Sequence, residues 1–129
     1  MRVPQAIGDV ADRITILRRK LERVVEPAAR AFVDRELTAL LLAWTEERLP
    51  ALADLVEVAE LTRVNAALWD IEDRLRALEA DGEFGAEFVA AARAVYRLND
   101  ERALWKRRLN ERLGSPFVEV KLYGADGSG

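Results

Sequence analysis

The sequence of 129 residues contains neither cysteine nor histidine. Without cysteine there are no disulfides, thiolate metal sites or cysteine nucleophiles, and without histidine the commonest general base and transition-metal ligand is absent. Catalysis would therefore have to use carboxylates, Lys, Arg, Tyr, Ser or Thr, or a hard metal held by carboxylates. We expect no cofactor and no metal ion, and we favour a non-catalytic protein while leaving enzymatic activity open.

Long hydrophobic runs are also missing. The longest, residues 39–44, is far shorter than the roughly 18 residues that a transmembrane helix needs. Asp9 and Asp12 interrupt the N-terminal segment, which therefore does not resemble a signal peptide. Half of the residues are hydrophobic and a third are charged, as is typical of globular proteins. These features predict a cytoplasmic protein without membrane contact, with one helical domain over residues 1–123 and a flexible tail over residues 124–129.

The spacing of apolar residues predicts four helices. We expect them to run from Gly8 or Asp9 to just before Pro27, from Pro27 to about Arg48, from Pro50 to about Ala80, and from about Ala86 to Leu113. Apolar and charged residues alternate over residues 117–123, which predicts a short extended segment. This segment either lies along the helices or pairs with Arg2 and Val3. The predicted fold is all-α, a four-helix antiparallel bundle dominated by the long hairpin of the last two helices, with a short extended C-terminal segment.

The formal net charge of −3 is unevenly distributed. Residues 50–87 contain ten acidic and three basic residues, whereas residues 88–113 contain seven basic and three acidic residues. Helices of opposite charge are expected to pack against each other, and no nucleic-acid-binding motif is recognisable, so we do not expect a nucleic-acid partner. Counting outward from the turn at about residue 83, residues of the third and fourth predicted helices whose numbers add to about 166 should lie opposite each other. This register predicts that Lys106 faces Glu60 and that Arg102 faces Asn65.

The candidate site lies where polar residues interrupt or adjoin the apolar faces of the last two predicted helices. Arg102 occupies a position in the apolar stripe of the fourth helix, and Asn99 and Lys106 lie about one turn on either side of it. The residues beside the stripe of the third helix are Asn65, Trp69, Glu72 and Arg76, and the first three join the candidate site. Because a buried polar group needs partners, these residues either satisfy one another in a structural network or line a binding site.

As a binding site, this cluster would suit an anionic ligand. Arg102 would bind it as a bidentate fork, Lys106 would add a second positive charge, and the two asparagines would orient it. Trp69 would form a flat wall. An enzyme that acts by electrostatic preorganisation would use the same residues together with Lys20 and Glu72. Helical chorismate mutases bind a dianion with Arg and Lys in this way, and the first predicted helix offers Arg13, Lys20 and Arg23, but the helix order and spacing do not match closely.

Two acidic pairs on the third helix raise the question of a metal site. Glu57 with Glu60, and Asp70 with Asp73, are spaced i, i+3, which is similar to the Mg²⁺-binding pairs of all-α nucleotide pyrophosphohydrolases. On one continuous helix the two pairs are roughly 20 Å apart, so they cannot share a metal ion within a subunit. We therefore interpret these residues as a solvated acidic face.

With these residues laid out, the sequence resembles a family of small bacterial and phage proteins, the domain of unknown function 6165. The resemblance rests on Asp12, residues 14–17, Lys20, residues 64–65, the Trp-Asp-Ile-Glu-Asp run at residues 69–73 with Leu68, residues 99–100, Arg102, residues 106–107, Asn110, residues 114–115, Glu119, Lys121 and Tyr123. It implies that the polar stripe positions belong to a family pattern. It implies no activity, ligand or catalytic residue, and it points only weakly to genes of glycosyltransferases or polysaccharide synthesis as neighbours.

The sequence leaves three functional interpretations. The first is a non-catalytic module that interacts with proteins or binds a small anionic ligand, as a homodimer or higher homo-oligomer or beside a partner protein. The alternative is a small all-α enzyme acting on a phosphorylated or carboxylated metabolite. In the third, the polar cluster only fixes helix register and the protein is a scaffold. Stabilisation by a ligand separates the ligand-binding interpretations from the scaffold.

Overall fold

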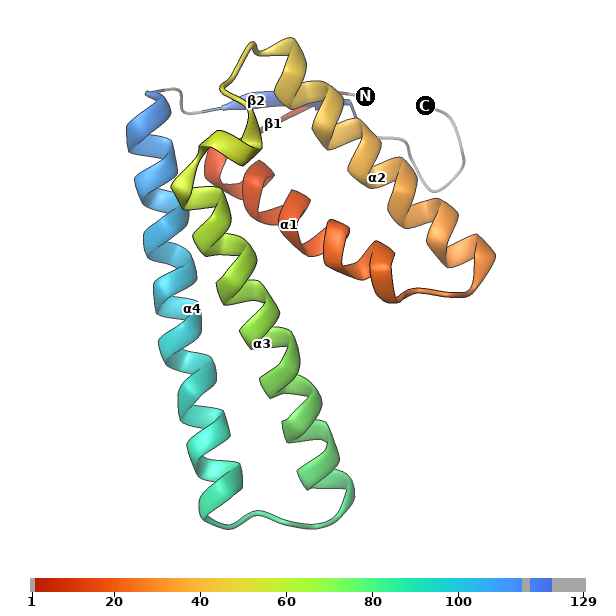
Figure 1. Ribbon diagram of the computed structural model, residues 1–129, viewed down its shortest axis with the longest axis vertical. Coiled ribbons are helices and arrows are strands. Elements are labelled where there is room, and N and C mark those ends of the chain that lie inside the picture. Colours follow the sequence, from red (N-terminus) through yellow and green to blue (C-terminus); the bar gives the residue numbers. More distant parts are fainter. Residues whose placement is uncertain (1, 115–116, 122–129) are drawn as a thin grey trace.

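The structure, a computed structural model, describes residues 2–114 and 117–121. Along this described chain the elements are β1 (Arg2–Gln5), α1 (Ile7–Arg23), α2 (Pro27–Glu46), the 3₁₀ turn η1 (Leu52–Asp54), α3 (Val56–Ala80), α4 (Ala86–Leu113) and β2 (Val118–Lys121) (Figure 1). The prediction of an all-α protein with four helices and a short extended segment is confirmed. Residues 122–123 of the predicted segment and the predicted tail lie outside the described residues. None of the described helices is long and apolar enough to cross a lipid bilayer.

The predicted start of the third helix at Pro50 is wrong. Arg48 has a left-handed backbone conformation with φ of 55°, and α2 has ended by this point. The indole Nε1 of Trp44 then donates a hydrogen bond to the carbonyl oxygen of Pro50 at 2.8 Å, which ties the connection back onto α2. The chain makes the single turn η1 before α3 begins at Val56. At the other end of the chain, α1 starts at Ile7, slightly earlier than predicted.

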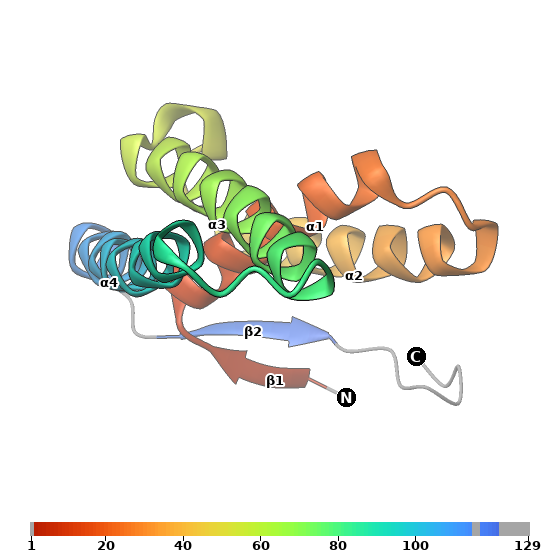
Figure 2. The same ribbon diagram turned by 90° about the horizontal axis from the view of Figure 1, so that it is seen from below.

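The helices form two hairpins, α1 with α2 and α3 with α4, which diverge from a shared end (Figure 1). At that end α1 packs against α2, α3 and α4. Figure 2 shows the two strands as a layer beneath α1 and α2, on the side away from α3. In a regular four-helix bundle the helices stay side by side along their length. Here the turn between α3 and α4 instead lies well beyond α1 and α2.

The two strands pair at the chain termini. They are antiparallel, with Arg2 opposite Lys121 and Gln5 opposite Val118. Val118 and Val120 are buried, whereas Glu119 and Lys121 are exposed, as the alternation of apolar and charged residues predicts. Both arrangements left open by the sequence are present, because the segment pairs with Arg2 and Val3 and also packs against α2.

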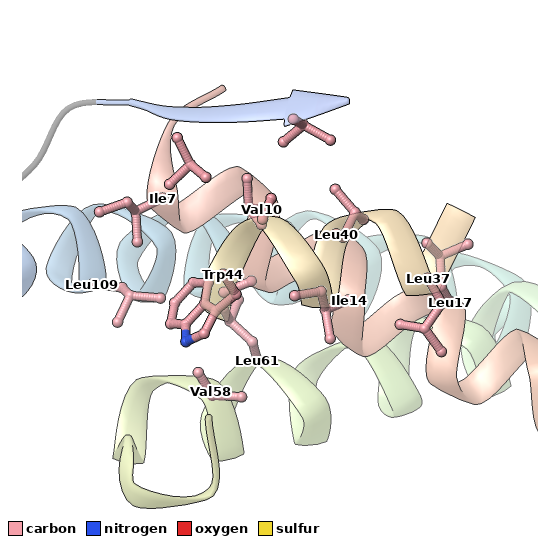
Figure 3. Packing of buried hydrophobic residues seen from close by; sticks show 14 of the residues in the cluster. Ile7, Val10, Ile14, Leu17, Leu37, Leu40, Trp44, Val58, Leu61 and Leu109 are labelled. Atoms are coloured by element: carbon pink, nitrogen blue, oxygen red, sulfur yellow. The ribbon is translucent and has the colours of Figure 1, made fainter. Parts of the chain in front are cut away.

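The hydrophobic core is concentrated at the shared end of the hairpins. Ile7, Ile14 and Leu17 of α1, Leu61 of α3 and Leu109 of α4 have no exposed surface. Figure 3 shows these side chains meeting others from α2 in one cluster. Full burial of such a side chain stabilises the folded state by about 1.5–3 kcal/mol. Most of the apolar stabilisation of the protein therefore arises at this end.

The far part of the α3–α4 hairpin, residues 69–100, is called the arm here, and the rest of the described chain is called the head. Within the arm, all of which is described, Leu78 is the one buried residue. Apolar residues between its two helices, such as Leu75 and Leu98, are only half-buried. A hairpin of two helices covers such residues from one side only. The arm is therefore a projection with little core of its own.

Candidate functional site

The predicted cluster around Arg102 forms a polar network between three helices, and its centre is Asp12 of α1. The Asp12 side chain is almost completely buried. Arg102 of α4 binds it as a fork, with Nε donating to Oδ1 at 2.9 Å and Nη2 donating to Oδ2. From α3, Asn65 Nδ2 donates to Asp12 Oδ1 at 2.8 Å and to Thr15 Oγ1 at 2.9 Å. Thr15 Oγ1 in turn donates to the Asp12 carbonyl oxygen at 2.7 Å.

The charges in this network balance. The hydrogen bonds to Asp12 raise the pKa of Arg102 above its ordinary value, although burial acts in the opposite direction. The guanidinium of Arg102 is therefore the charged partner of the Asp12 carboxylate. A carboxylate and a guanidinium that meet as a fork satisfy each other's geometry, and Asn65 supplies a further donor to the same carboxylate. The bidentate face of Arg102 is occupied by the protein's own carboxylate.

One and two turns further along α4, two more polar contacts join it to α1. Lys106 Nζ lies 2.8 Å from Asp9 Oδ1. The amide of Gly8 donates to Asn110 Oδ1 at 2.6 Å. A Cβ atom built on Gly8 would lie 2.4 Å from the Lys106 carbonyl oxygen, so the two backbones meet where only glycine fits. This seam of polar contacts fixes where α1 crosses α4.

The remaining predicted site residues do not join the network. Trp69 packs beneath the guanidinium groups of Arg19 and Arg23, which lie 6.0 and 5.5 Å from its ring centroid. Glu72 and Asn99 are exposed, although the charge of Glu72 acts weakly on Arg102. Lys20 is also exposed. The structure therefore brings Arg102 and Asn65 together, places Lys106 beside them on Asp9, and leaves Trp69, Glu72, Asn99 and Lys20 apart from them.

The predicted partner of Lys106 across the hairpin is wrong, because Lys106 pairs with Asp9 of α1 and not with Glu60. Arg102 does meet Asn65, as the register predicts, since both donate to Asp12 Oδ1, but the ion pair of Arg102 is with α1. The ion pairs that do cross from α3 to α4 are Arg63–Glu101, Arg74–Glu87 and Glu57–Arg112. In two of the three, the base is on the acidic helix and the acid is on the basic helix. The residue numbers of these three pairs add to between 161 and 169, close to the predicted sum of 166. The register of the hairpin was therefore nearly correct, although the sequence did not predict which residues form ion pairs.

Sequence reasoning missed Asp12 and Thr15 as members of the network. A signal was present, because an arginine in an apolar stripe calls for a buried carboxylate, and Asp12 lies among the apolar residues of the first helix. It also missed Glu57, whose side chain is buried and lies 3.3 Å from Arg112. One oxygen of Glu57, Oε1, is buried without a hydrogen bond in the described structure. No group of acidic residues in the described chain is arranged to hold a metal ion.

An open hollow of about 400 Å³ lies at the turn between α1 and α2. It is lined by Leu21, Pro27, Arg30, Ala31 and Asp34. It is distant in sequence from Arg102 and shares no residue with the polar network. The hollow therefore adds no ligand pocket to the predicted site.

Comparison with curated proteins gives no match, and comparison with solved structures gives none either. A match does come from the protein families, and it covers residues 1–128, nearly the whole chain. The sequence resemblance noted above is thereby confirmed. The protein belongs to the family of unknown function DUF6165.

Proposed function

We propose that the protein is a non-catalytic interaction module, in which the head is a rigid base and the arm presents a helical surface to a protein partner. The observation that carries this proposal is a single stripe along α4 with members three and four residues apart. Its head members, Asn110 and Lys106, contact α1. Its other members lie nearer the tip of the arm, and all of them are exposed except Ala92, which is half-buried.

The uncovered part of the stripe has the composition of a protein contact. Its members are Val89, Ala92, Tyr96, Asn99 and Ala103. None of these residues is charged, and Tyr96 and Val89 are 74% and 44% exposed. Tyrosine is enriched at the centres of protein interfaces, because it buries a large ring while keeping a polar tip. An uncharged face on an otherwise highly charged helix favours a docking surface over a solvated one.

The polar network supports the same proposal, because it argues against an anion site at Arg102. Arg102 was the central residue of the predicted anion site, and its fork is filled by Asp12. An external anion would have to displace a buried carboxylate and leave it unpaired, which opposes binding. A structural task for the network, the joining of α1, α3 and α4, accounts for each of its hydrogen bonds.

A photo-crosslinking amino acid tests the proposal in the cells from which the gene comes. Placed at Tyr96, it should form covalent adducts with another polypeptide. The matched control is Val25, which is 89% exposed at the α1–α2 turn and outside the arm. Adducts at position 96 but not at position 25 support the proposal. Equal yields at both positions, or none at either, contradict it.

Anion binding, the other form of the prediction, has its own test. A ligand that binds the folded state at a hundred times its dissociation constant stabilises the protein by about 2.7 kcal/mol. Inorganic phosphate and citrate at millimolar concentrations should therefore leave the melting temperature unchanged if Arg102 serves only the network. A rise that disappears in an Asn65→Ala variant would instead favour a ligand site at this position.

A further inference from the structure

The uncovered stripe on α4 lies between two clusters of opposite charge. It extends from Val89 to Ala103, roughly 21 Å along the helix. At the tip of the arm, residues 79–87 contain four acidic residues and no basic one. At the other end, residues 106–112 contain four basic residues and one acidic residue. Both ends of one helical surface are therefore charged, and with opposite sign.

Part of this charge has no partner within the described structure. At the tip, Glu79, Asp81 and Glu83 make no ion pair there, while Glu87 pairs with Arg74. At the other end, Lys106 and Arg112 pair with carboxylates of the head, as described above. Arg107 makes no ion pair in the described structure and is exposed, and Arg108 stacks on Trp105 at 5.0 Å. Unpaired acids and an unpaired arginine thus lie beyond the two ends of the uncharged stripe.

We propose that the stripe on α4 packs against the same stripe of a second copy of the chain, with the two α4 helices antiparallel about a two-fold axis near Tyr96. This inference rests on the proposed function, since it names the partner of the same surface. In this arrangement residues whose numbers add to about 192 lie opposite each other. Val89 meets Ala103 of the other copy, and the two Tyr96 rings meet at the axis.

The antiparallel arrangement also brings the opposite charges together. Arg107 of one copy comes level with residues 85–86 of the other, between Glu83 and Glu87. Arg93 comes level with Asn99 and Asp100. Each of these contacts occurs twice, because a two-fold interface is self-complementary. A parallel arrangement would instead place like charges beside each other at both ends.

A second copy would also bury apolar surface that a single arm leaves exposed. Two arms packed in this way place four helices in one assembly, and the contact buries Tyr96 and Val89, which α3 leaves exposed. The small side chains at positions 92 and 103 allow the helix axes to approach, while Tyr96 fills the centre. An unrelated partner would have to reproduce the same order of acidic, uncharged and basic segments, which the chain itself already supplies.

Light scattering of the purified full chain, over a range of concentrations, tests the association. We expect a mass of twice the 14.5 kDa of one chain. Tyr96→Lys should raise the dissociation constant at least tenfold, because it buries a charge at the centre of the interface. The control Val25→Lys should leave the dimer intact. A wild type that stays monomeric up to about 1 mM overturns the inference, as does a dimer that Tyr96→Lys leaves unchanged.

The absence of cysteine allows a direct test of orientation. Val89→Cys and Ala103→Cys are prepared as separate variants, mixed and oxidised. An antiparallel pair predicts a disulfide between one variant and the other, and little from either variant alone. Disulfides between identical variants would overturn the antiparallel arrangement. If crosslinks from position 96 reach a different protein in cells while the purified chain is monomeric, the second copy is excluded and the proposed function stands.

Discussion

The two halves of α4 differ in which of their side chains are covered by the rest of the protein. In its head half, residues 101–113, the helix packs against α1, and the contacts there include Arg102, Lys106 and Asn110. In its arm half, residues 86–100, no residue is buried, and the large apolar side chains of Tyr96 and Val89 are exposed. The head half thus combines the buried Leu109 with polar contacts to α1, whereas the arm half leaves apolar groups exposed.

The two halves of α4 therefore have different roles, one in fixing the helix crossing and the other in the proposed association. A polar network specifies a unique crossing of α1, α3 and α4, because its hydrogen bonds are lost if the register shifts. The exposed apolar stripe adds little to the folding of a single chain. In our proposal it serves association with a partner.

The largest expected effect comes from breaking the network on the head side. Arg102→Leu would leave the buried Asp12 carboxylate without its cation, which should destabilise the fold by roughly 3–5 kcal/mol. We expect the melting temperature to fall by about ten degrees or more. Asp12→Asn combined with Arg102→Leu should recover part of the loss, because no charge is then stranded. A single variant as stable as the wild type would contradict the structural role of the network and return Arg102 to the candidates for a ligand site.

Matched truncations compare the two halves directly. Leu109 is fully buried in the head half, whereas Leu98 is half-buried in the arm half. Leu109→Ala should destabilise the protein by roughly 2–5 kcal/mol, as for other buried leucines. Leu98→Ala should destabilise it by clearly less, because it removes fewer contacts. Urea unfolding at a concentration where the chain is monomeric provides the measurement, and equal losses would refute the distinction between head and arm.

The crossing of α1 and α4 gives the smallest of these effects. Gly8→Ala forces a methyl group against the Lys106 carbonyl, so the helices must separate. Overpacking of this kind destabilises proteins by roughly 1–3 kcal/mol. Gly85→Ala is the control, because nothing lies within 4 Å of the added Cβ and the backbone is not left-handed. Thermal unfolding of both variants provides the measurement. Equal melting temperatures for Gly8→Ala and Gly85→Ala would contradict the close crossing of α1 and α4.

The sequence predicted the helices well because each apolar stripe is local. The alternation at residues 117–123 likewise predicted an extended segment, of which residues 118–121 form a strand, and Arg102 and Asn65 were correctly grouped. The partner of Arg102 was not predicted, because the register of one hairpin says nothing about which third helix crosses it. That crossing depends on Gly8, whose need for close approach becomes visible only when the two backbones are placed together.

The start of α3 was missed for a related reason. Pro50 suits the first turn of a helix, so local preference favoured that position. The hydrogen bond from Trp44 to the Pro50 carbonyl holds the chain in a different path. Tertiary contact decided the outcome here, as it did for Lys106, whose partner Asp9 comes from a helix nearly a hundred residues earlier.

Backbone hydrogen exchange along α4, measured at increasing protein concentration, tests the central claim most directly. Few buried contacts leave a helix open to local unfolding, so residues 86–100 should exchange faster than residues 101–113 in dilute solution. We predict that residues 86–100 become protected as the concentration rises, while the protection of residues 101–113 stays constant. Equal protection of both halves at every concentration would contradict the account.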